Sequence, residues 1–240
     1  MKLIQLKSSN FSKKKRILDD IKLIILHYTG MQSMRASIKR LTSIKFKVSC
    51  HYLISREGKV YQLVDDNKIA WHAGKSKWRN FKNLNNKSIG IELVNKGHKL
   101  GYQKYTNKQI NALINICIKL QKKYNIDNRL ILGHSDIAPL RKFDPGEKFP
   151  WHKLNKKKIG ILCDSSKLIL VPKNFTKENA RKIFFRNLHK IGYRYFSKFK
   201  SLKTDKLIIK SFQRRFRQVK VNGIIDLECL RISEYLAKKH

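Results

Sequence analysis

Residues 22–30, KLIILHYTG, contain an unbroken aliphatic run that is followed at once by a histidine. Four consecutive large aliphatic side chains before a Thr-Gly pair predict a short strand that is buried in the core. His27 then lies at the carboxyl end of this strand, where an open α/β sheet gathers its functional groups. This segment therefore predicts a central sheet with a polar residue at the carboxyl end of one strand.

Three more segments predict strands. Residues 51–64, HYLISREGKVYQLV, have two β-rich runs around a turn that contains Gly58, which is typical of a hairpin. Residues 88–95, SIGIELVN, and 129–136, RLILGHSD, contain apolar runs of strand length. The last of these strands is expected to end at His134, so a second histidine lies at a strand end.

The period of the apolar residues changes from two to 3.6 between these last two strands. Thr106 and Gln109 have the spacing of a capping box at the start of a helix. Apolar residues then recur at helical spacing: Ile110, Leu113, Ile114, Cys117 and Tyr124. Strands with an intervening helix predict an α/β fold for residues 1–160, with a central mixed β-sheet flanked by helices.

The remaining residues predict a small helical domain. The run NKKK at 155–158 has the composition of a solvated connector, and a short apolar run, KLILVP at 167–172, follows it. From Thr176 onward, three apolar stripes have helical spacing: Ala180, Ile183, Phe184, Leu188 and Ile191; Ile208, Phe212, Phe216 and Val219; and Leu227, Leu230 and Leu236. Asp226 is placed to cap the third helix. We therefore expect a small three-helix domain at residues 170–240.

The net charge of +39 comes from 55 Lys and Arg residues against 16 Asp and Glu residues, and the excess is spread along the whole chain. A nucleic-acid-binding protein usually gathers its basic residues in one stripe, so this distribution disfavours that class. Lys, Ile and Asn are abundant and have A/T-rich codons, so genomic base composition is sufficient to explain much of the charge, and a functional use of the charge stays open. The resulting field still attracts polyanions of any kind.

Cysteine usage and the length of the apolar runs exclude other classes. The four cysteines form no CxxC pair, so we expect small buried side chains rather than a thiolate zinc site: Cys50, Cys117, Cys163 and Cys229. The run LIIL at 23–26 is too short for a signal-peptide core or a membrane span. The sequence therefore predicts no export signal, no lipid-attachment cysteine and no transmembrane segment.

Three residues with zinc-binding side chains follow predicted strands: His27, His134 and Asp144. Two imidazoles and one carboxylate leave one coordination position for water, which is the arrangement of a catalytic zinc site. Zinc lowers the pKa of its bound water to about 7, so this arrangement predicts a hydrolase. Glu92, an acid within an apolar strand, is suited to move a proton from the water to a leaving amine. Lys142 is suited to stabilise negative charge on a carbonyl oxygen.

Each of these residues also has a structural interpretation. A histidine at a strand end is commonly a hydrogen-bonded structural residue, and a lone glutamate in a strand can face solvent at a sheet edge. Asp144 precedes Pro145 and Gly146 and suits a turn, and Lys142 is one of many lysines. Residue spacing alone leaves the zinc site and these structural roles open.

Five strings resemble, in order and spacing, those of the zinc-dependent N-acetylmuramoyl-L-alanine amidases of the type-2 family, which also includes the peptidoglycan-recognition domains. The strings are LHYTG, CHYLISREGKVYQLV, AWHAGKS, SIGIELVN and GHSDIAPLRKFDPGEKFPW, and they cover roughly residues 20–155. The segment IIKSFQRRFRQVKVNGIIDLECL is similar to the three-helix peptidoglycan-binding module that is often joined to such enzymes. The two-module arrangement resembles amidases that Gram-negative bacteria anchor to the outer membrane as lipoproteins.

The resemblance implies one Zn²⁺ per chain, held by His27, His134 and Asp144. Glu92 falls on the family's general base and Lys142 on its oxyanion-stabilising lysine. The implied reaction is hydrolysis of the amide bond between N-acetylmuramic acid and L-alanine, in peptidoglycan or in muropeptides. All five positions are intact, which disfavours an inactive recognition domain.

The resemblance also implies residues that line the substrate cleft. These positions fall on His51, Trp71 and His72, although packing roles suit His51 and Trp71 equally well. His72 is the best candidate to touch substrate, because Gly74 in the following loop exposes it. The two histidines His98 and His152 are expected to be surface or packing residues.

The expected partner is therefore peptidoglycan or a muropeptide, with no specific nucleic acid, and the chain is expected to be a monomer. The resemblance points to the periplasm or the outer membrane, whereas the missing export signal leaves cytoplasmic recycling of muropeptides open. Two other classes make different predictions. A non-catalytic wall-binding protein would sediment with peptidoglycan without cleaving it, and a nucleic-acid-binding protein would bind in a steeply salt-dependent way.

Overall fold

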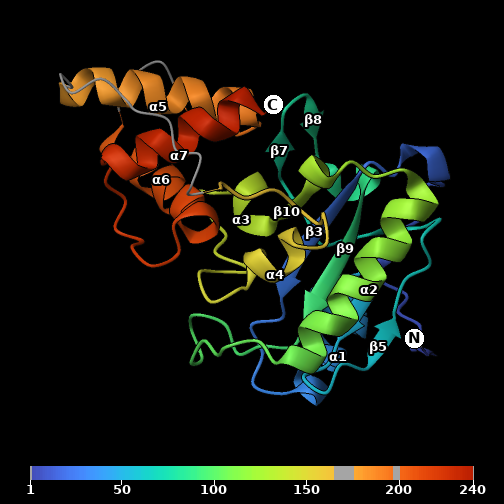
Figure 1. Cartoon of the computed structure of the whole chain (residues 1–240). Helices are drawn as coiled ribbons and strands as arrows, with labels where there is room; N and C mark the ends of the chain where they lie inside the picture. Colours follow the sequence, from blue (N-terminus) through green and yellow to red (C-terminus); the bar gives the residue numbers. More distant parts are fainter. Residues whose placement is uncertain (1, 165–175, 197–200, 240) are drawn as a thin grey trace.

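The computed structural model describes residues 2–164, 176–196 and 201–239, and its centre is a six-stranded sheet (Figure 1). The strand order is β1-β5-β4-β9-β3-β10. The strands are Leu3–Gln5 (β1), Leu23–Tyr28 (β3), Tyr52–Ile54 (β4), Val60–Gln62 (β5), Ser88–Leu93 (β9) and Ile131–Gly133 (β10). β4 and β5 pair antiparallel as the predicted hairpin, whereas β9, β3 and β10 pair parallel. The predicted α/β fold with a mixed sheet is confirmed.

β3 is buried on both faces, which explains its unbroken aliphatic run. Ile24 and Leu26 belong to a hydrophobic cluster with residues of α2 (Asn107–Tyr124). Leu23 and Ile25 belong to a second cluster, which includes residues of the carboxyl-terminal helices. Alternate residues of a strand face opposite sides of the sheet, so four aliphatic residues fill two cores.

α2 covers one face of the sheet and begins where the sequence predicts. The Thr106 hydroxyl oxygen accepts a hydrogen bond from the backbone N–H of Gln109 at 3.1 Å. The predicted capping box is only half formed, because the Gln109 amide donates to the carbonyl oxygens of Ile54 and Val94 at 3.2 and 3.1 Å. This buried side chain therefore ties the helix to the ends of β4 and β9 instead of returning to Thr106.

Short elements complete the region before residue 164. They are α1 (Met34–Thr42), α3 (His134–Ile137), α4 (Trp151–Asn155), β2 (Phe11–Ser12), β6 (Ile69–Ala70), β7 (Lys77–Trp78) and β8 (Phe81–Lys82). The hairpin turn of β4 and β5 contains Gly58 at a φ of +81°, and a Cβ there would lie 2.7 Å from the carbonyl oxygen of Lys108. Glycine is therefore required where the hairpin meets α2.

Three helices follow, as the apolar stripes predict: α5 (Lys177–Ile191), α6 (Leu202–Phe216) and α7 (Leu227–Lys238). Asp226 accepts a hydrogen bond from the backbone N–H of Cys229 at 3.1 Å, which confirms the predicted cap. One stripe assignment is wrong, because Val219 lies beyond the end of α6 and is 95% exposed. Leu227 lies in α7 as predicted, but it is 45% exposed. The apolar run at 167–172 lies outside the described residues.

The helical part packs directly on the sheet, and Figure 1 shows α6 beside α3. One hydrophobic cluster joins Leu23 and Leu132 of the sheet to Phe184 of α5 and Phe212 of α6. The predicted domains at residues 1–160 and 170–240 thus share a core, and the boundary between them stays a prediction.

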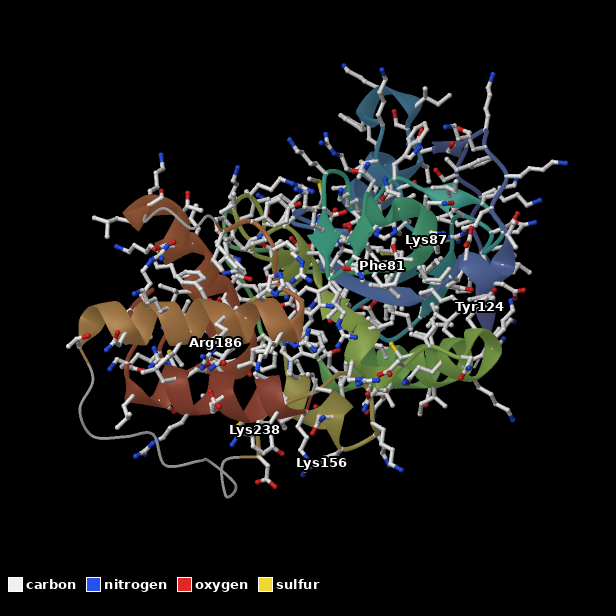
Figure 2. All side chains as sticks on the ribbon, turned by 90° about the horizontal axis from the view of Figure 1, so that it is seen from above. Phe81, Lys87, Tyr124, Lys156, Arg186 and Lys238 are labelled. Atoms are coloured by element: carbon white, nitrogen blue, oxygen red, sulfur yellow. The ribbon has the colours of Figure 1, made fainter. Side chains whose placement is uncertain are left out.

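The surface reflects the basic composition. Figure 2 shows nitrogen-tipped side chains around both the sheet and the helices, with Lys156 and Lys238 among those labelled. No helix in the described parts of the chain is long and apolar enough to cross a bilayer. All four cysteines are free thiols; three are buried as predicted, and Cys163 is partly exposed.

Candidate active site

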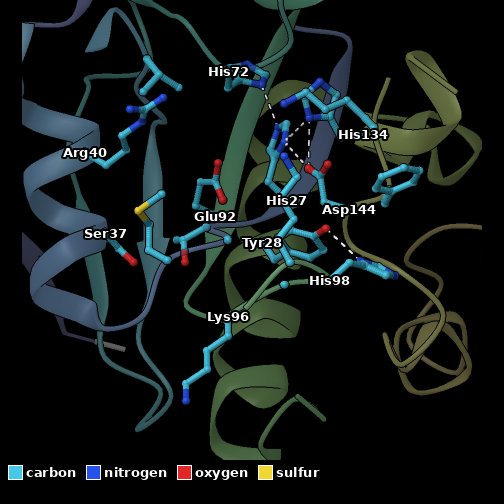
Figure 3. Close-up of a pocket in the computed structure, with 18 of the residues that line it drawn as sticks. His27, Tyr28, Ser37, Arg40, His72, Glu92, Lys96, His98, His134 and Asp144 are labelled. Atoms are coloured by element: carbon cyan, nitrogen blue, oxygen red, sulfur yellow. Dashed lines mark hydrogen bonds and ion pairs between the residues drawn. The ribbon is translucent and has the colours of Figure 1, made fainter. Parts of the chain in front are cut away.

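Three parallel strands bring polar residues to one edge of the sheet (Figure 3). His27 in β3 lies opposite Glu92 in β9 in the register of the sheet. His134 comes directly after β10, and Asp144 lies in the loop that follows α3. These four residues and Lys142 line one pocket of about 320 Å³. The structure thus brings together all five residues that the sequence predicts as ligands or catalytic groups.

The three predicted ligands form a compact cluster that fits a metal ion. His27 Nδ1 lies 2.9 Å from His134 Nδ1, and both atoms lie 3.0 Å from Asp144 Oδ2. All three residues are buried and each offers one ligand atom. Atoms that bind a tetrahedral zinc ion at 2.0–2.1 Å are about 3.3 Å apart, so a small outward movement of these side chains would admit the ion.

Hydrogen bonds on the far side of each imidazole define which nitrogen carries the proton. His134 Nε2 lies 3.1 Å from the carbonyl oxygen of Ala73 and donates to it. His27 Nε2 lies 3.0 Å from His72 Nδ1, and His72 Nε2 lies 3.3 Å from the Ser88 hydroxyl. One assignment satisfies this chain: His27 donates to His72, and His72 donates to Ser88. Both Nδ1 atoms of the cluster then keep a lone pair for a cation.

The electrostatics of the cluster support this assignment. Burial, followed by the neighbouring His134, lowers the pKa of His27 to about 4, so its ring is neutral at pH 7. Burial opposes ionisation of Asp144, but its close contacts with His134 and His27 outweigh this effect and lower the pKa of Asp144. A neutral His27 imidazole and an ionised Asp144 carboxylate are in the protonation states that bind a divalent cation.

Glu92 lies in a central strand and is only 8% exposed, which excludes a role as a solvent-facing edge residue. Its Oε2 atom is buried and has no hydrogen-bond partner among the described residues. Burial, followed by the negative charge of Asp144, raises the pKa of Glu92 to about 8, while Lys142 acts in the opposite direction. A carboxyl group in such surroundings can take up and release a proton near neutral pH.

Basic residues give the pocket a positive lining. Lys142 is joined there by four others: Arg40, Lys96, Lys99 and Arg141. Arg141 is held in place because its guanidinium donates to the carbonyl oxygens of Ala73 and Lys75 at 2.6 and 2.8 Å. A cleft of this sign concentrates anionic substrates.

The three predicted substrate-binding residues occupy different places. His72 lines the pocket, and its ring lies over Gly90, where a Cβ would be 2.4 Å from the imidazole. His51 is buried outside the pocket lining; its Nδ1 accepts from the backbone N–H of Gly90 at 3.0 Å, and its Nε2 lies 2.8 Å from Arg16. Trp71 also lies outside the pocket lining. One of the three therefore reaches the pocket, and it lies against the ligand His27.

Two aromatic residues of the pocket wall, Tyr28 and His98, were not predicted to line it. Tyr28 lines the pocket, and its hydroxyl lies 2.9 Å from Nδ1 of His98, which lines it too. His98, expected as a surface or packing residue, stacks on Tyr102 and lies 3.1 Å from Glu147. The available signal in the sequence was Gly97, two residues after the predicted strand at 88–95. In the structure its φ is +68°, and a Cβ there would lie 2.5 Å from the Tyr28 ring.

Comparisons with known proteins agree with this geometry. Residues 18–147 match the family model described as N-acetylmuramoyl-L-alanine amidase. The chain is 33% identical to the N-acetylmuramoyl-L-alanine amidase AmiD of Escherichia coli, over 92% of this chain and 83% of AmiD. It is 30% identical to the 1,6-anhydro-N-acetylmuramyl-L-alanine amidase AmpD of Haemophilus influenzae, over 62% of this chain and 88% of AmpD. A solved complex of E. coli AmiD with the substrate anhydro-N-acetylmuramic acid-L-Ala-D-gamma-Glu-L-Lys has a TM-score of 0.81 at 30% identity, covering 95% of this chain and 92% of that one.

Proposed function

This chain belongs to the N-acetylmuramoyl-L-alanine amidase family, and on that premise we propose that it is a zinc hydrolase of peptidoglycan fragments. It cleaves the amide bond that joins the lactyl group of N-acetylmuramic acid to L-alanine, in cell-wall remodelling or recycling. One observation carries the mechanism: the ligand cluster of His27, His134 and Asp144 shares a pocket with Glu92, whose Oε2 has no hydrogen-bond partner in the described parts of the chain.

The residues of the pocket have separate roles in this reaction. His27, His134 and Asp144 would hold Zn²⁺, which supplies a Lewis acid and acidifies a bound water. Glu92 accepts a proton from the attacking water and returns it to the alanine nitrogen as the C–N bond breaks. Lys142 stabilises the negative charge that develops on the lactyl carbonyl oxygen.

We further propose that the positive lining of the pocket binds the acidic stem peptide. The carboxylates of such a peptide are complementary to Arg40, Lys96 and Lys99, which line the pocket beyond the ligand cluster. Of the three residues that the family resemblance assigns to substrate, only His72 lines the pocket, and its ring contacts the ligand His27; His51 and Trp71 lie outside the pocket lining. The chain is expected to act as a monomer, which light scattering after size exclusion would test.

The proposed reaction is tested with the purified full chain and muropeptides of both the anhydro and the ordinary type. Zinc is quantified, removed with a chelator and restored, and the products are identified by mass spectrometry at each stage. We expect about one zinc per chain and release of peptides with a free L-alanine amino terminus, lost and regained with the metal. Bound zinc and retention on peptidoglycan without any cleavage would instead indicate a wall-recognition protein.

A further inference from the structure

The helical domain contacts the active-site segment that carries two of the three proposed metal ligands. This ligand segment, residues 134–144, starts at His134 and ends at Asp144, and α3 forms its first turn. The Ser211 hydroxyl of α6 donates to the carbonyl oxygen of Ser135 at 2.7 Å. The Arg215 guanidinium of α6 donates to Asp136 Oδ2 at 2.5 Å. The residue next to His134 and the one after it are thus both bound by one helix.

Arg215 contacts one residue that precedes His134 in the chain and one that follows it. Its Nη2 donates to the carbonyl oxygen of Ile131 in β10 at 3.1 Å, while its Nη1 binds Asp136 in α3. Asp136 Oδ2 also accepts from the backbone N–H of Gly133 at 2.8 Å, and its other oxygen accepts from the Tyr193 hydroxyl at 2.7 Å. The turn between strand and helix that presents the imidazole is therefore held by a closed set of hydrogen bonds.

This ion pair is deeply buried, which affects what it can contribute. The side chains of Arg215 and Asp136 are 2% and 1% exposed. A buried ion pair adds little net stability, since desolvation of both charges offsets their attraction. Its directional hydrogen bonds do define one arrangement of the backbone around them. Loss of Arg215 alone would leave the Asp136 charge buried without this partner, at a cost in stability, so the test must separate that cost from an effect on the position of His134.

The adjacent Arg214 reaches the other end of the ligand segment. Its guanidinium carbon lies 4.6 Å from the centre of the Phe143 ring, and its Nε lies 3.8 Å from Glu147. Phe143 lines the pocket and stands between Lys142 and Asp144 in the chain. Two consecutive arginines of α6 thus touch both ends of the segment.

We propose that Arg215 is a positioning residue of the metal centre, acting on His134 through Asp136 and Ile131. The helical domain is then part of the scaffold of the active site, in addition to the wall-binding role that its sequence resemblance implies. This inference rests on the proposed zinc site. Partners that orient metal ligands typically change metal affinity by 10- to 100-fold when they are lost, so an effect of that size is expected.

α6 and the residue after it offer a matched control in Arg217. It is 3% exposed, as is Arg215, but its guanidinium binds Asp226 and the carbonyl oxygen of Lys220, both within the helical domain. Arg215→Met and Arg217→Met therefore remove the same buried charge and the same number of atoms. They differ in whether the lost contacts lead to the ligand segment.

The test uses the full chain as wild type, Arg215→Met and Arg217→Met. Zinc affinity is measured by competition with a chelator, the visible spectrum is recorded with Co²⁺ in place of zinc, and kcat and KM are measured at saturating zinc. We expect Arg215→Met to bind zinc about 10- to 100-fold more weakly, to shift the cobalt bands and to lower kcat with KM little changed. Arg217→Met also breaks a buried arginine's ion pair, so it is expected to lower the melting temperature, but to leave zinc affinity and the cobalt spectrum unchanged.

Wild-type affinity and spectrum in a folded Arg215→Met would overturn the positioning role and leave only a structural one. If Arg215→Met does not fold, Arg215→Lys and Asp136→Asn are measured in the same way, and unchanged zinc affinity in both overturns the proposal. The wild type distinguishes this result from failure of the proposed function. A wild type that binds no zinc removes the metal site itself, whereas zinc binding that is indifferent to Arg215 removes only the role of this residue.

Discussion

The ligand side of the pocket and the Glu92 side are built in opposite ways. His27 and His134 each have a hydrogen-bond partner on the nitrogen that faces away from the cluster, and Asp144 lies against both rings. Glu92 is buried, its Oε2 has no hydrogen-bond partner within the residues that the structure describes, and its pKa is raised to about 8. Ligands with fixed partners hold one geometry, whereas a carboxyl group without them is free to exchange a proton with water. The fold thus supports the ligands and holds the base at a cost in stability.

The largest expected effect follows from removing a ligand. Asp144→Ala deletes one of the three ligand atoms, so the chain should lose bound zinc, and peptide release should fall by about 10³-fold or more. Zinc content by mass spectrometry and the rate of peptide release are measured together. Asp127→Ala is the control, since this acid pairs with Arg129 outside the pocket. Full zinc occupancy in Asp144→Ala would contradict the assignment of the ligand side.

Glu92→Gln should separate chemistry from metal binding. The amide keeps the size of the side chain but cannot accept the proton, so kcat should fall by about 10²- to 10⁴-fold while zinc content stays at the wild-type level. The rate of hydrolysis and the zinc content of the same preparation provide the check. Loss of zinc from this variant would show that Glu92 contributes to metal binding, which would contradict the distinction between the ligands and the base.

The same substitution should make the metal-free protein more stable, in a pH-dependent way. Folding raises the pKa of Glu92 from 4.5 to about 8, so the folded state binds its proton more tightly and stability is lost as pH rises through that window. Glu92→Gln removes this loss, and we expect a gain of roughly 2–4 kcal/mol at pH 9 and little at pH 4. Urea unfolding of chelator-treated protein measures both values. An equal gain at both pH values would show that ionisation is not the cause.

Lys142→Met should have an intermediate effect on rate and a distinct effect on the pH profile. Loss of an oxyanion-stabilising group typically lowers kcat by about 10²- to 10³-fold. Lys142 also lowers the pKa of Glu92, so its removal should move the acidic limb of the rate profile to higher pH, because Glu92 acts as a base only when ionised. Lys148→Met, outside the pocket lining, should leave the profile in place. An unshifted acidic limb in Lys142→Met would show that the charge of Lys142 does not affect the pKa of Glu92.

The local sequence pattern predicts those features of the fold and the site that depend on a single strand or helix. The aliphatic run of β3 places His27 at a strand end, and Glu92 stands out because an acid in an apolar strand is costly to bury. The helical stripes likewise predict α5, α6 and α7. Each of these inferences uses a period of two or 3.6 residues, which one element carries by itself.

Other features depend on how distant elements meet, and local pattern does not contain that information. His51 and His72 both lie within the strings that resemble the family, yet His51 binds the backbone of Gly90 and His72 binds His27. The pairing of β4 with β9 and the fold of the following loop decide which of the two rings faces the pocket. Arg215 and Asp136 are 79 residues apart in sequence. Their contact requires the docking of α6 on α3, which no stripe of apolar residues specifies.

The smallest expected effect concerns His72, which either orients the ligand His27 or contacts the substrate. As a partner of His27, it orients a ligand, so His72→Phe should weaken zinc binding by about 10- to 100-fold and leave KM unchanged at saturating zinc. As a substrate contact, it would raise KM and leave zinc affinity at the wild-type value. Chelator competition and steady-state kinetics on the same protein separate these results, and Trp71→Phe, one residue away and outside the pocket lining, serves as the control.

Because the hydrogen bond from His27 already uses His72 Nδ1 and Ser88 accepts from Nε2, no ring nitrogen of His72 is left for substrate. The change in zinc affinity is therefore the result we expect.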